Sequence, residues 1–211
     1  IKLFQNPYYL KPIQDKEYQR AVDTIMTKAS ASDKVYDYLL GYMISGFERI
    51  DNEEVLTYIS EHYSGDKRCK DNDHLTSLNK RVEGFKKFTL GSIAPDISVK
   101  DMNGKAITLA GLNSQYTLIV FWASWCPHCV DELPDLKKIY ENQPVKKMEV
   151  LAISLDTNIV SWIDFIKSGS YNWINCSDFK GWEGKAAQDY YVYATPTMLL
   201  LDKDKKILGK P

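Results

Sequence analysis

Residues 125–129 read Trp-Cys-Pro-His-Cys, and they directly follow an apolar run at residues 116–122, Tyr-Thr-Leu-Ile-Val-Phe-Trp. The run is rich in β-branched and aromatic residues, which predicts a strand, whereas residues 131–142 have the pattern of a helix. A strand that ends in Cys-x-x-Cys and continues into a helix places Cys126 at the helix N-terminus. There the unpaired N–H groups and the helix dipole favour a thiolate over a thiol. The pattern therefore predicts a redox-active dithiol.

Size and charge narrow the classes of protein to consider. The chain has 211 residues, a hydrophobic fraction of 44% and a formal net charge of -1. This is enough apolar sequence for one large domain or two modest ones. The balanced charge gives no electrostatic reason to expect a nucleic acid or an anionic membrane as partner. No apolar run approaches the ~20 residues of a membrane-spanning helix.

The two parts of the chain differ in pattern. Residues 1–88 carry apolar residues at helical spacing and predict an all-helical domain of unknown role. Residues 89–211 alternate strands and helices, which predicts an α/β sheet with right-handed crossovers. The expected elements of this second part are a hairpin at 97–109, strands at 116–122, 148–155, 173–175, 197–201 and 206–208, and helices at 131–142, 159–168 and 183–191.

The two cysteines of the motif are expected to have different roles. Thiol–disulfide exchange needs a thiolate that attacks and a second thiol that resolves the mixed disulfide. Cys126, at the helix start and more exposed, is the predicted nucleophile, and Cys129, one turn in and more buried, is the predicted resolving thiol. A protonated His128 would stabilise the Cys126 thiolate, and Pro127 suits the first helical turn because it needs no N–H partner.

A structural zinc half-site is the main alternative for a Cys-x-x-Cys pair. Such a site needs a second pair of ligands, and the sequence contains no second Cys-x-x-Cys and no His-x-x-His. The strand-to-helix position beside Trp125 also does not suit a zinc knuckle. We therefore expect no metal. Cys69 and Cys176 have no local partner and are expected to be partly buried small residues.

Taken together, the motifs resemble those of the thioredoxin fold. More narrowly, they are similar to the TlpA/ResA-like exported thiol-disulfide oxidoreductases, which are related to the AhpC/TSA proteins. The resemblance covers about residues 89–211 and rests on Gly91–Asp96, the turn at Asp101–Lys105, Phe121–Cys129, Pro134 and Ala194–Thr197. It implies a thioredoxin-like fold with an N-terminal β-hairpin and a central βα insertion at about 159–184. The family continues into a C-terminal helix, which we expect to be absent because this sequence stops at Pro211.

The resemblance also implies further site residues. Pro196 matches the family's cis-proline, which faces the dithiol, and the main chain of Thr195 would pair with an extended substrate segment. Glu132 matches an acidic residue three positions past the second cysteine. Because i and i+3 share a helix face, a partly buried Glu132 could accept the proton of Cys129. Thioredoxins proper carry a buried aspartate where this chain has Val120, so Glu132 is expected to be the only nearby carboxylate.

The implied function is reduction of protein disulfides, such as those of apocytochrome c or other envelope proteins. A membrane thiol donor would keep the dithiol reduced, and the Cys126–Cys129 disulfide would be the only redox group, without a further cofactor. The resemblance implies a periplasmic or cell-envelope location. The first residue, Ile1 rather than Met, is also expected from a processed export signal.

Three other functions stay open at this point. The Pro127-His128 dipeptide is also that of DsbA-type oxidants, although the large helical insertion of those proteins is missing here. A peroxiredoxin-type peroxidase would need Pro-x-x-x-Thr-x-x-Cys, and neither cysteine of the motif has it. The helical part could instead be a non-enzymatic binding module. Trp162, Trp173 and Trp182 are expected to pack in the fold rather than to form a binding site.

Overall fold

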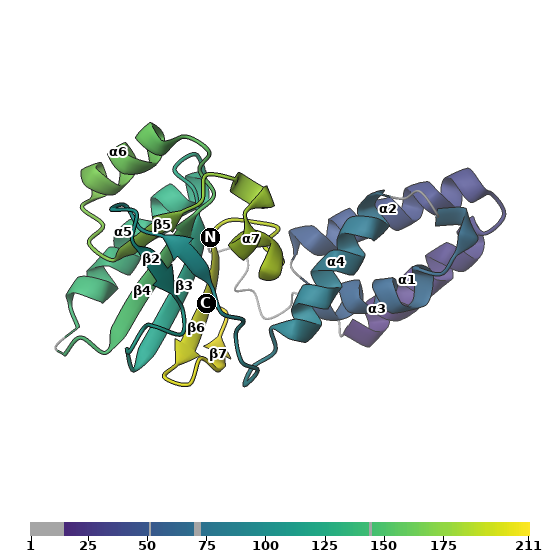
Figure 1. Cartoon of the computed structure of the whole chain (residues 1–211). Coiled ribbons are helices and arrows are strands. Elements are labelled where there is room, and N and C mark those ends of the chain that lie inside the picture. The colour runs from purple at the N-terminus through teal and green to yellow at the C-terminus, as the bar shows by residue number, and fades with distance from the viewer. Residues whose placement is uncertain (1–14, 51, 70–72, 144) are drawn as a thin grey trace, which may run out of the picture. The chain divides into compact units, whose positions relative to one another are not determined.

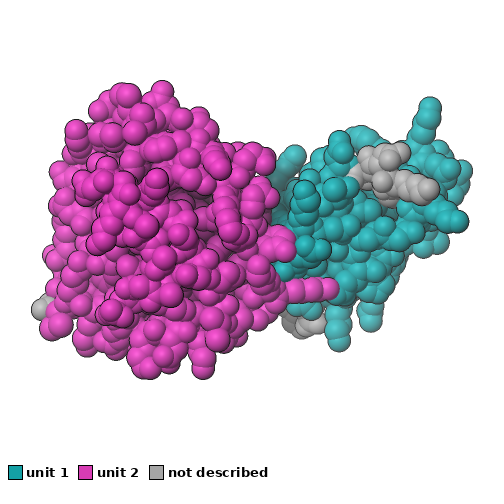
Figure 2. All heavy atoms as spheres, in the orientation of Figure 1, with its two compact units in different colours: residues 1–85 teal, residues 86–211 magenta. Residues whose placement is uncertain are grey.

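The computed structural model describes residues 15–50, 52–69, 73–143 and 145–211. The chain divides between Phe85 and Lys86 into two compact units, which Figure 2 shows in different colours. The first unit is helical in its described part, and the second combines a sheet with helices (Figure 1). Each unit has its own cluster of buried apolar side chains. The helical prediction for residues 1–14 lies outside the described residues.

Polar contacts fix the ends and crossings of the helices in the first unit. The Asn52 side chain accepts a hydrogen bond from the Val55 N–H at 2.9 Å and so caps one helix. Asp23 accepts hydrogen bonds from the hydroxyls of Tyr58 and Tyr63, at 2.7 and 2.6 Å, and thereby joins two helices. The helices and a short 3-10 turn are α1 (Asp15–Ala29), α2 (Asp33–Arg49), α3 (Glu53–Tyr63), η2 (Lys67–Cys69) and α4 (Asp73–Lys87).

Helix α2 lies in the part of the chain predicted to be helical, and it carries apolar side chains on two faces, of which only one is buried. Val35, Tyr38 and Tyr42 are exposed. The side chains that α2 buries are those of Tyr36, Leu40, Met43 and Ile44. Tyrosine and valine are compatible with either environment, so the spacing alone could not distinguish the two faces.

The second unit is built on a five-stranded sheet with the strand order β5-β4-β3-β6-β7. The central strand β3 is parallel to β4 and antiparallel to β6. Residues 117–122 of β3 are all buried, as expected for a strand covered on both faces. The strands of this sheet are β3 (Tyr116–Trp122), β4 (Met148–Ser154), β5 (Ile174–Ser177), β6 (Thr197–Asp202) and β7 (Ile207–Gly209).

Helix α5 (Pro127–Glu141) connects β3 to β4, and α6 (Ile159–Gly169) connects β4 to β5 (Figure 1). α5 buries Cys129, Leu133 and Leu136, which recur at helical spacing and form its core-facing stripe. The helix predicted at 183–191 is shorter than expected: a 3-10 turn, η3 (Gly181–Glu183), precedes α7 (Lys185–Asp189). The other strands and helices predicted for 116–208 are confirmed within a few residues.

A β-hairpin precedes the sheet, as the sequence predicts. Its strands are β1 (Ser98–Lys100) and β2 (Ala106–Thr108). The Asp101 carboxylate accepts hydrogen bonds from the N–H groups of Asn103 and Lys105, both at 2.9 Å, which closes the turn. Gly104 adopts φ +77° there, a conformation that glycine tolerates best.

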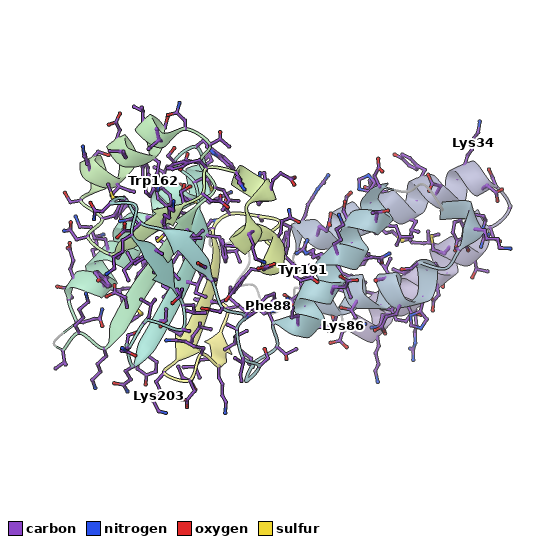
Figure 3. All side chains as sticks on the ribbon, viewed as in Figure 1. Lys34, Lys86, Phe88, Trp162, Tyr191 and Lys203 are labelled. Atoms are coloured by element: carbon purple, nitrogen blue, oxygen red, sulfur yellow. The ribbon has the colours of Figure 1, made fainter. Side chains whose placement is uncertain are left out.

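Phe88 belongs to the core of the second unit. Its ring stacks on Tyr190 with centroids 5.0 Å apart, and Tyr191 lies beside it at 6.4 Å (Figure 3). Trp162, also labelled in Figure 3, belongs to α6 and is buried together with Ile166.

Among the helices of the described residues, none combines the length and the apolar character needed to cross a membrane.

Candidate active site

Cys126 is the N-cap residue of α5. The chain leaves β3 at Trp122, turns through residues 123–125, and enters the helix at Pro127. The Cys126 Sγ accepts a hydrogen bond from the Cys129 N–H, with 3.3 Å between the heavy atoms. This contact uses one of the N–H groups that the first helical turn leaves without a backbone partner. The helix therefore begins four residues earlier than the pattern at 131–142 predicts.

The two thiols differ in exposure and in acidity. Cys126 is 4% exposed and Cys129 is fully buried, which agrees with the predicted order. Burial raises the pKa of Cys126, but hydrogen bonds with the Cys129 thiol, with the Thr195 side chain and with the backbone N–H groups of Cys129 and His128 outweigh it, so the pKa is lowered. Burial and the hydrogen bond with Cys126 raise the pKa of Cys129 to about 12. The pair therefore combines a thiol of lowered pKa, Cys126, with a thiol that is protonated at neutral pH, Cys129.

The loop at Thr195 lies against this thiol pair. The Cys126 thiol donates to the Thr195 carbonyl oxygen at 3.2 Å. The contact follows from the sheet: Phe121 of β3 is paired with Thr197 of β6, so the loop before β6 runs beside the turn after β3. The Thr195–Pro196 peptide bond is cis, which confirms the geometry that the resemblance implies.

The other residues predicted to tune the dithiol have exposed side chains, whereas the two cysteines are buried. Trp125, Pro127 and His128 are all exposed, and 55% of the Trp125 surface is accessible. A protonated imidazole at position 128 would therefore act on Cys126 through a partly aqueous environment.

Glu132 does not have the expected environment. Its side chain is exposed rather than partly buried. Leu133, the next residue along α5, takes the core-facing position instead. The role of Glu132 as proton acceptor stays a prediction.

A carboxylate that the sequence analysis missed is buried close to the active-site turn. Asp156 is 1% exposed. It accepts hydrogen bonds from the N–H and hydroxyl of Ser124, at 3.0 and 2.6 Å, and from the hydroxyl of Ser154 at 2.6 Å. The expectation that Glu132 is the only nearby carboxylate is therefore wrong.

The position of Asp156 could have been inferred from the topology. Trp122 and Ser154 are paired neighbours at the carboxyl ends of β3 and β4. The carboxyl ends of adjacent parallel strands form one edge, so residues two positions further on, Ser124 and Asp156, meet there. Asp156 thereby holds the turn that leads into Cys126.

The three tryptophans expected to pack do not behave alike. Trp162 and Trp173 are buried. Trp182, in η3, is 39% exposed, and its ring centroid is 6.3 Å from that of Trp125. The packing prediction is therefore wrong for Trp182, which lies beside the active-site motif.

Cys176 is a fully buried free thiol in β5, and burial raises its pKa to about 12. The side chain of Cys69 lies outside the described residues. Within the described ranges, no group of three or more His, Cys, Asp and Glu side chains could hold a metal ion.

Comparisons with known proteins identify the family of the chain. The AhpC/TSA family matches residues 90–209. The thiol-disulfide oxidoreductase ResA of one Bacillus cereus strain is 32% identical over 124 residues, which are 59% of this chain and 70% of the relative. ResA of Bacillus subtilis (strain 168) is 26% identical over 133 residues, or 63% of this chain and 73% of the relative.

Solved structures show the same fold. The thioredoxin domain of a thiol-disulfide oxidoreductase from Bacteroides vulgatus has a TM-score of 0.54 at 27% identity, covering 58% of this chain and 87% of that one. A thioredoxin-like protein from Bacteroides caccae has a TM-score of 0.66 at 23% identity and covers 93% of this chain and 73% of that one, a likeness of fold alone. The chain therefore belongs to the AhpC/TSA family, as a ResA-like thiol-disulfide oxidoreductase whose thioredoxin-like fold follows an N-terminal helical region.

Proposed function

We propose that this chain reduces disulfide bonds in proteins of the cell envelope through Cys126 and Cys129. The observation that supports this most is the contrast between the two thiols. The pKa of Cys126 is lowered at a helix N-terminus, whereas burial and Cys126 itself raise that of Cys129 to about 12. A nucleophile and a protonated reserve thiol are what the two steps of disulfide exchange require.

In the first step the Cys126 thiolate attacks one sulfur of the substrate disulfide. A bond forms between Cys126 Sγ and that sulfur, the substrate S–S bond breaks, and the second substrate sulfur leaves as a thiolate that takes a proton from water. In the second step Cys129 loses its proton and attacks Cys126 Sγ, which releases the first substrate sulfur. Two electrons have then passed to the substrate, and the protein holds a Cys126–Cys129 disulfide.

The mixed disulfide itself makes Cys129 more reactive. Once Cys126 is bonded to substrate it carries no negative charge and no longer makes a thiol–thiolate hydrogen bond. These are two of the causes that raise the pKa of Cys129. We propose Glu132 as the acceptor that carries the released proton to water.

The proposed substrate contact is the main chain at Thr195, before Pro196. The N–H of Thr195 has no hydrogen-bond partner among the described residues, and its carbonyl oxygen faces Cys126 Sγ at 3.2 Å. An extended substrate segment could pair with these two groups in the manner of an added strand. Trp125, Pro127 and His128 would tune the reactivity of Cys126 from the surface.

The direction of electron flow and the location rest on similarity. Two ResA proteins of Bacillus are thiol-disulfide oxidoreductases like this chain. We propose that a membrane thiol donor re-reduces the Cys126–Cys129 disulfide and that the chain acts in the periplasm or cell envelope. We further propose that the described helical residues up to Phe85 act as a domain separate from the thioredoxin-like domain, whose core includes Phe88.

A disulfide-reduction assay tests the proposal. The full chain, supplied with dithiothreitol, is expected to accelerate the reduction of insulin, and a Cys126→Ser variant is expected to reduce it only at the uncatalysed rate. The matched control is Cys176→Ser, which removes a buried thiol outside the motif and is expected to keep the activity of the folded protein. Unchanged activity in Cys126→Ser would refute the assignment of the nucleophile.

A further inference from the structure

Two exposed tryptophans lie side by side next to the proposed nucleophile. Trp125 directly precedes Cys126, and Trp182 comes from η3, far along the chain. Their accessible fractions are 55% and 39%, their centroids are 6.3 Å apart, and their ring planes are inclined by 55°. Exposed indole surface is unfavourable in water, and tryptophan is enriched among the residues that dominate binding energy. The pair therefore forms an apolar surface beside Cys126.

The backbone that carries Trp182 is held in place from several sides. The Gln188 side chain donates a hydrogen bond to the Trp182 carbonyl oxygen at 2.6 Å. Gly181 has φ +59°, and a Cβ at this position would come within 3.3 Å of the Thr157 side chain and 3.5 Å of the Leu155 carbonyl oxygen. The turn thus packs against the loop after β4. A fixed aromatic residue loses little conformational entropy when a ligand binds to it.

The tryptophan pair borders Cys126, the residue at which a substrate disulfide would react. A disulfide sulfur bonded to Cys126 is next to Trp125, because the two residues are adjacent in the chain. Side chains of an extended segment alternate between its two sides, so a residue flanking the substrate cysteine can reach the tryptophan pair.

We propose that Trp182, together with Trp125, binds an apolar side chain that flanks the substrate cysteine and thereby selects protein disulfides with aromatic or aliphatic neighbours. This inference rests on the proposed function and adds the substrate class. The competing possibility is that the site prefers a cationic flanking side chain. Such a side chain would be attracted by the exposed carboxylate of Glu183, next to Trp182, and would lie over an indole face.

The test compares the wild-type chain with Trp182→Ala on synthetic disulfide peptides that differ only in the flanking residue, which is Phe, Ser or Lys. The wild type is expected to reduce the Phe peptide about tenfold faster than the Ser peptide, a ratio typical of one apolar contact. Trp182→Ala is expected to reduce both peptides at similar rates. Its rate with bis(2-hydroxyethyl) disulfide, which has no flanking residue, and its reduction potential are expected to be unchanged.

Two further variants separate recognition from folding. Trp182→Phe retains an aromatic ring and is expected to keep most of the preference for the Phe peptide. Ile139→Ala removes another exposed apolar side chain, 63% accessible near the end of α5, and is expected to have no effect. The inference about Trp182 would be overturned if Trp182→Ala still preferred the Phe peptide, or if the Lys peptide were reduced fastest. Neither result would affect the proposed function. A wild-type chain that reduces none of these disulfides would overturn the proposed function with it.

Discussion

A Cys129→Ser variant is expected to accumulate a covalent complex with a protein substrate, joined by a disulfide between Cys126 and a substrate cysteine. The backbone N–H that contacts Cys126 Sγ at 3.3 Å is retained in this variant, so the nucleophile keeps that stabilisation. A serine hydroxyl cannot attack a disulfide under these conditions, and the mixed disulfide persists. Turnover is expected to fall to the level of a single reaction per chain. Non-reducing gels and intact mass spectrometry measure the adduct.

The matched variant is Cys126→Ser. Cys129 is fully buried, and burial is the main reason for its raised pKa of about 12, so it is a poor nucleophile toward an external disulfide. We expect no adduct in this variant. Adducts formed equally by Cys126→Ser and Cys129→Ser would contradict the assignment of separate roles to the two thiols.

An Asp156→Asn variant is expected to lose about 3 kcal/mol of unfolding free energy. This corresponds to the loss of one or two hydrogen bonds to a charged group, which contribute ~1.5–3 kcal/mol each. The carboxylate accepts three hydrogen bonds, two from Ser124 and one from Ser154. An amide of the same size can accept at only one oxygen, and its NH₂ group faces donors. Urea unfolding of the reduced protein measures the change as a lower midpoint with an unchanged slope.

Asp135→Asn serves as the control for this prediction. Asp135 is on α5, and its ion pair with Lys138 is exposed on both sides. Exposed pairs contribute little, so a change within about 0.5 kcal/mol is expected. A similar small change in Asp156→Asn would show that the desolvation of this buried carboxylate cancels its hydrogen bonds, and that it does not hold the turn before Cys126.

The part of the site that is local in the chain could be predicted from the sequence. An apolar run followed by Cys-x-x-Cys and a helix determines which thiol is at the helix N-terminus, because all three features are adjacent. The contact with Thr195 required the family resemblance, since 69 positions separate it from Cys126. The sheet brings them together by pairing Phe121 with Thr197.

The missed features all depend on tertiary packing. Whether Glu132 is buried depends on how α5 is rotated against the sheet, and Leu133 takes the core position. Trp182 could have filled the core as Trp162 does, but its turn leaves it on the surface. Asp156 has no motif of its own and becomes recognisable only when the ends of β3 and β4 are placed side by side.

The most direct test of a reducing Cys126/Cys129 pair is its reduction potential, measured in glutathione redox buffers with the thiols quantified by alkylation. We predict a reversible two-electron couple near or below the value of thioredoxin, about −270 mV. A value near that of DsbA, about −120 mV, would contradict the proposed direction and indicate an oxidant in which His128 stabilises the thiolate. The absence of any reversible couple would contradict the redox function itself.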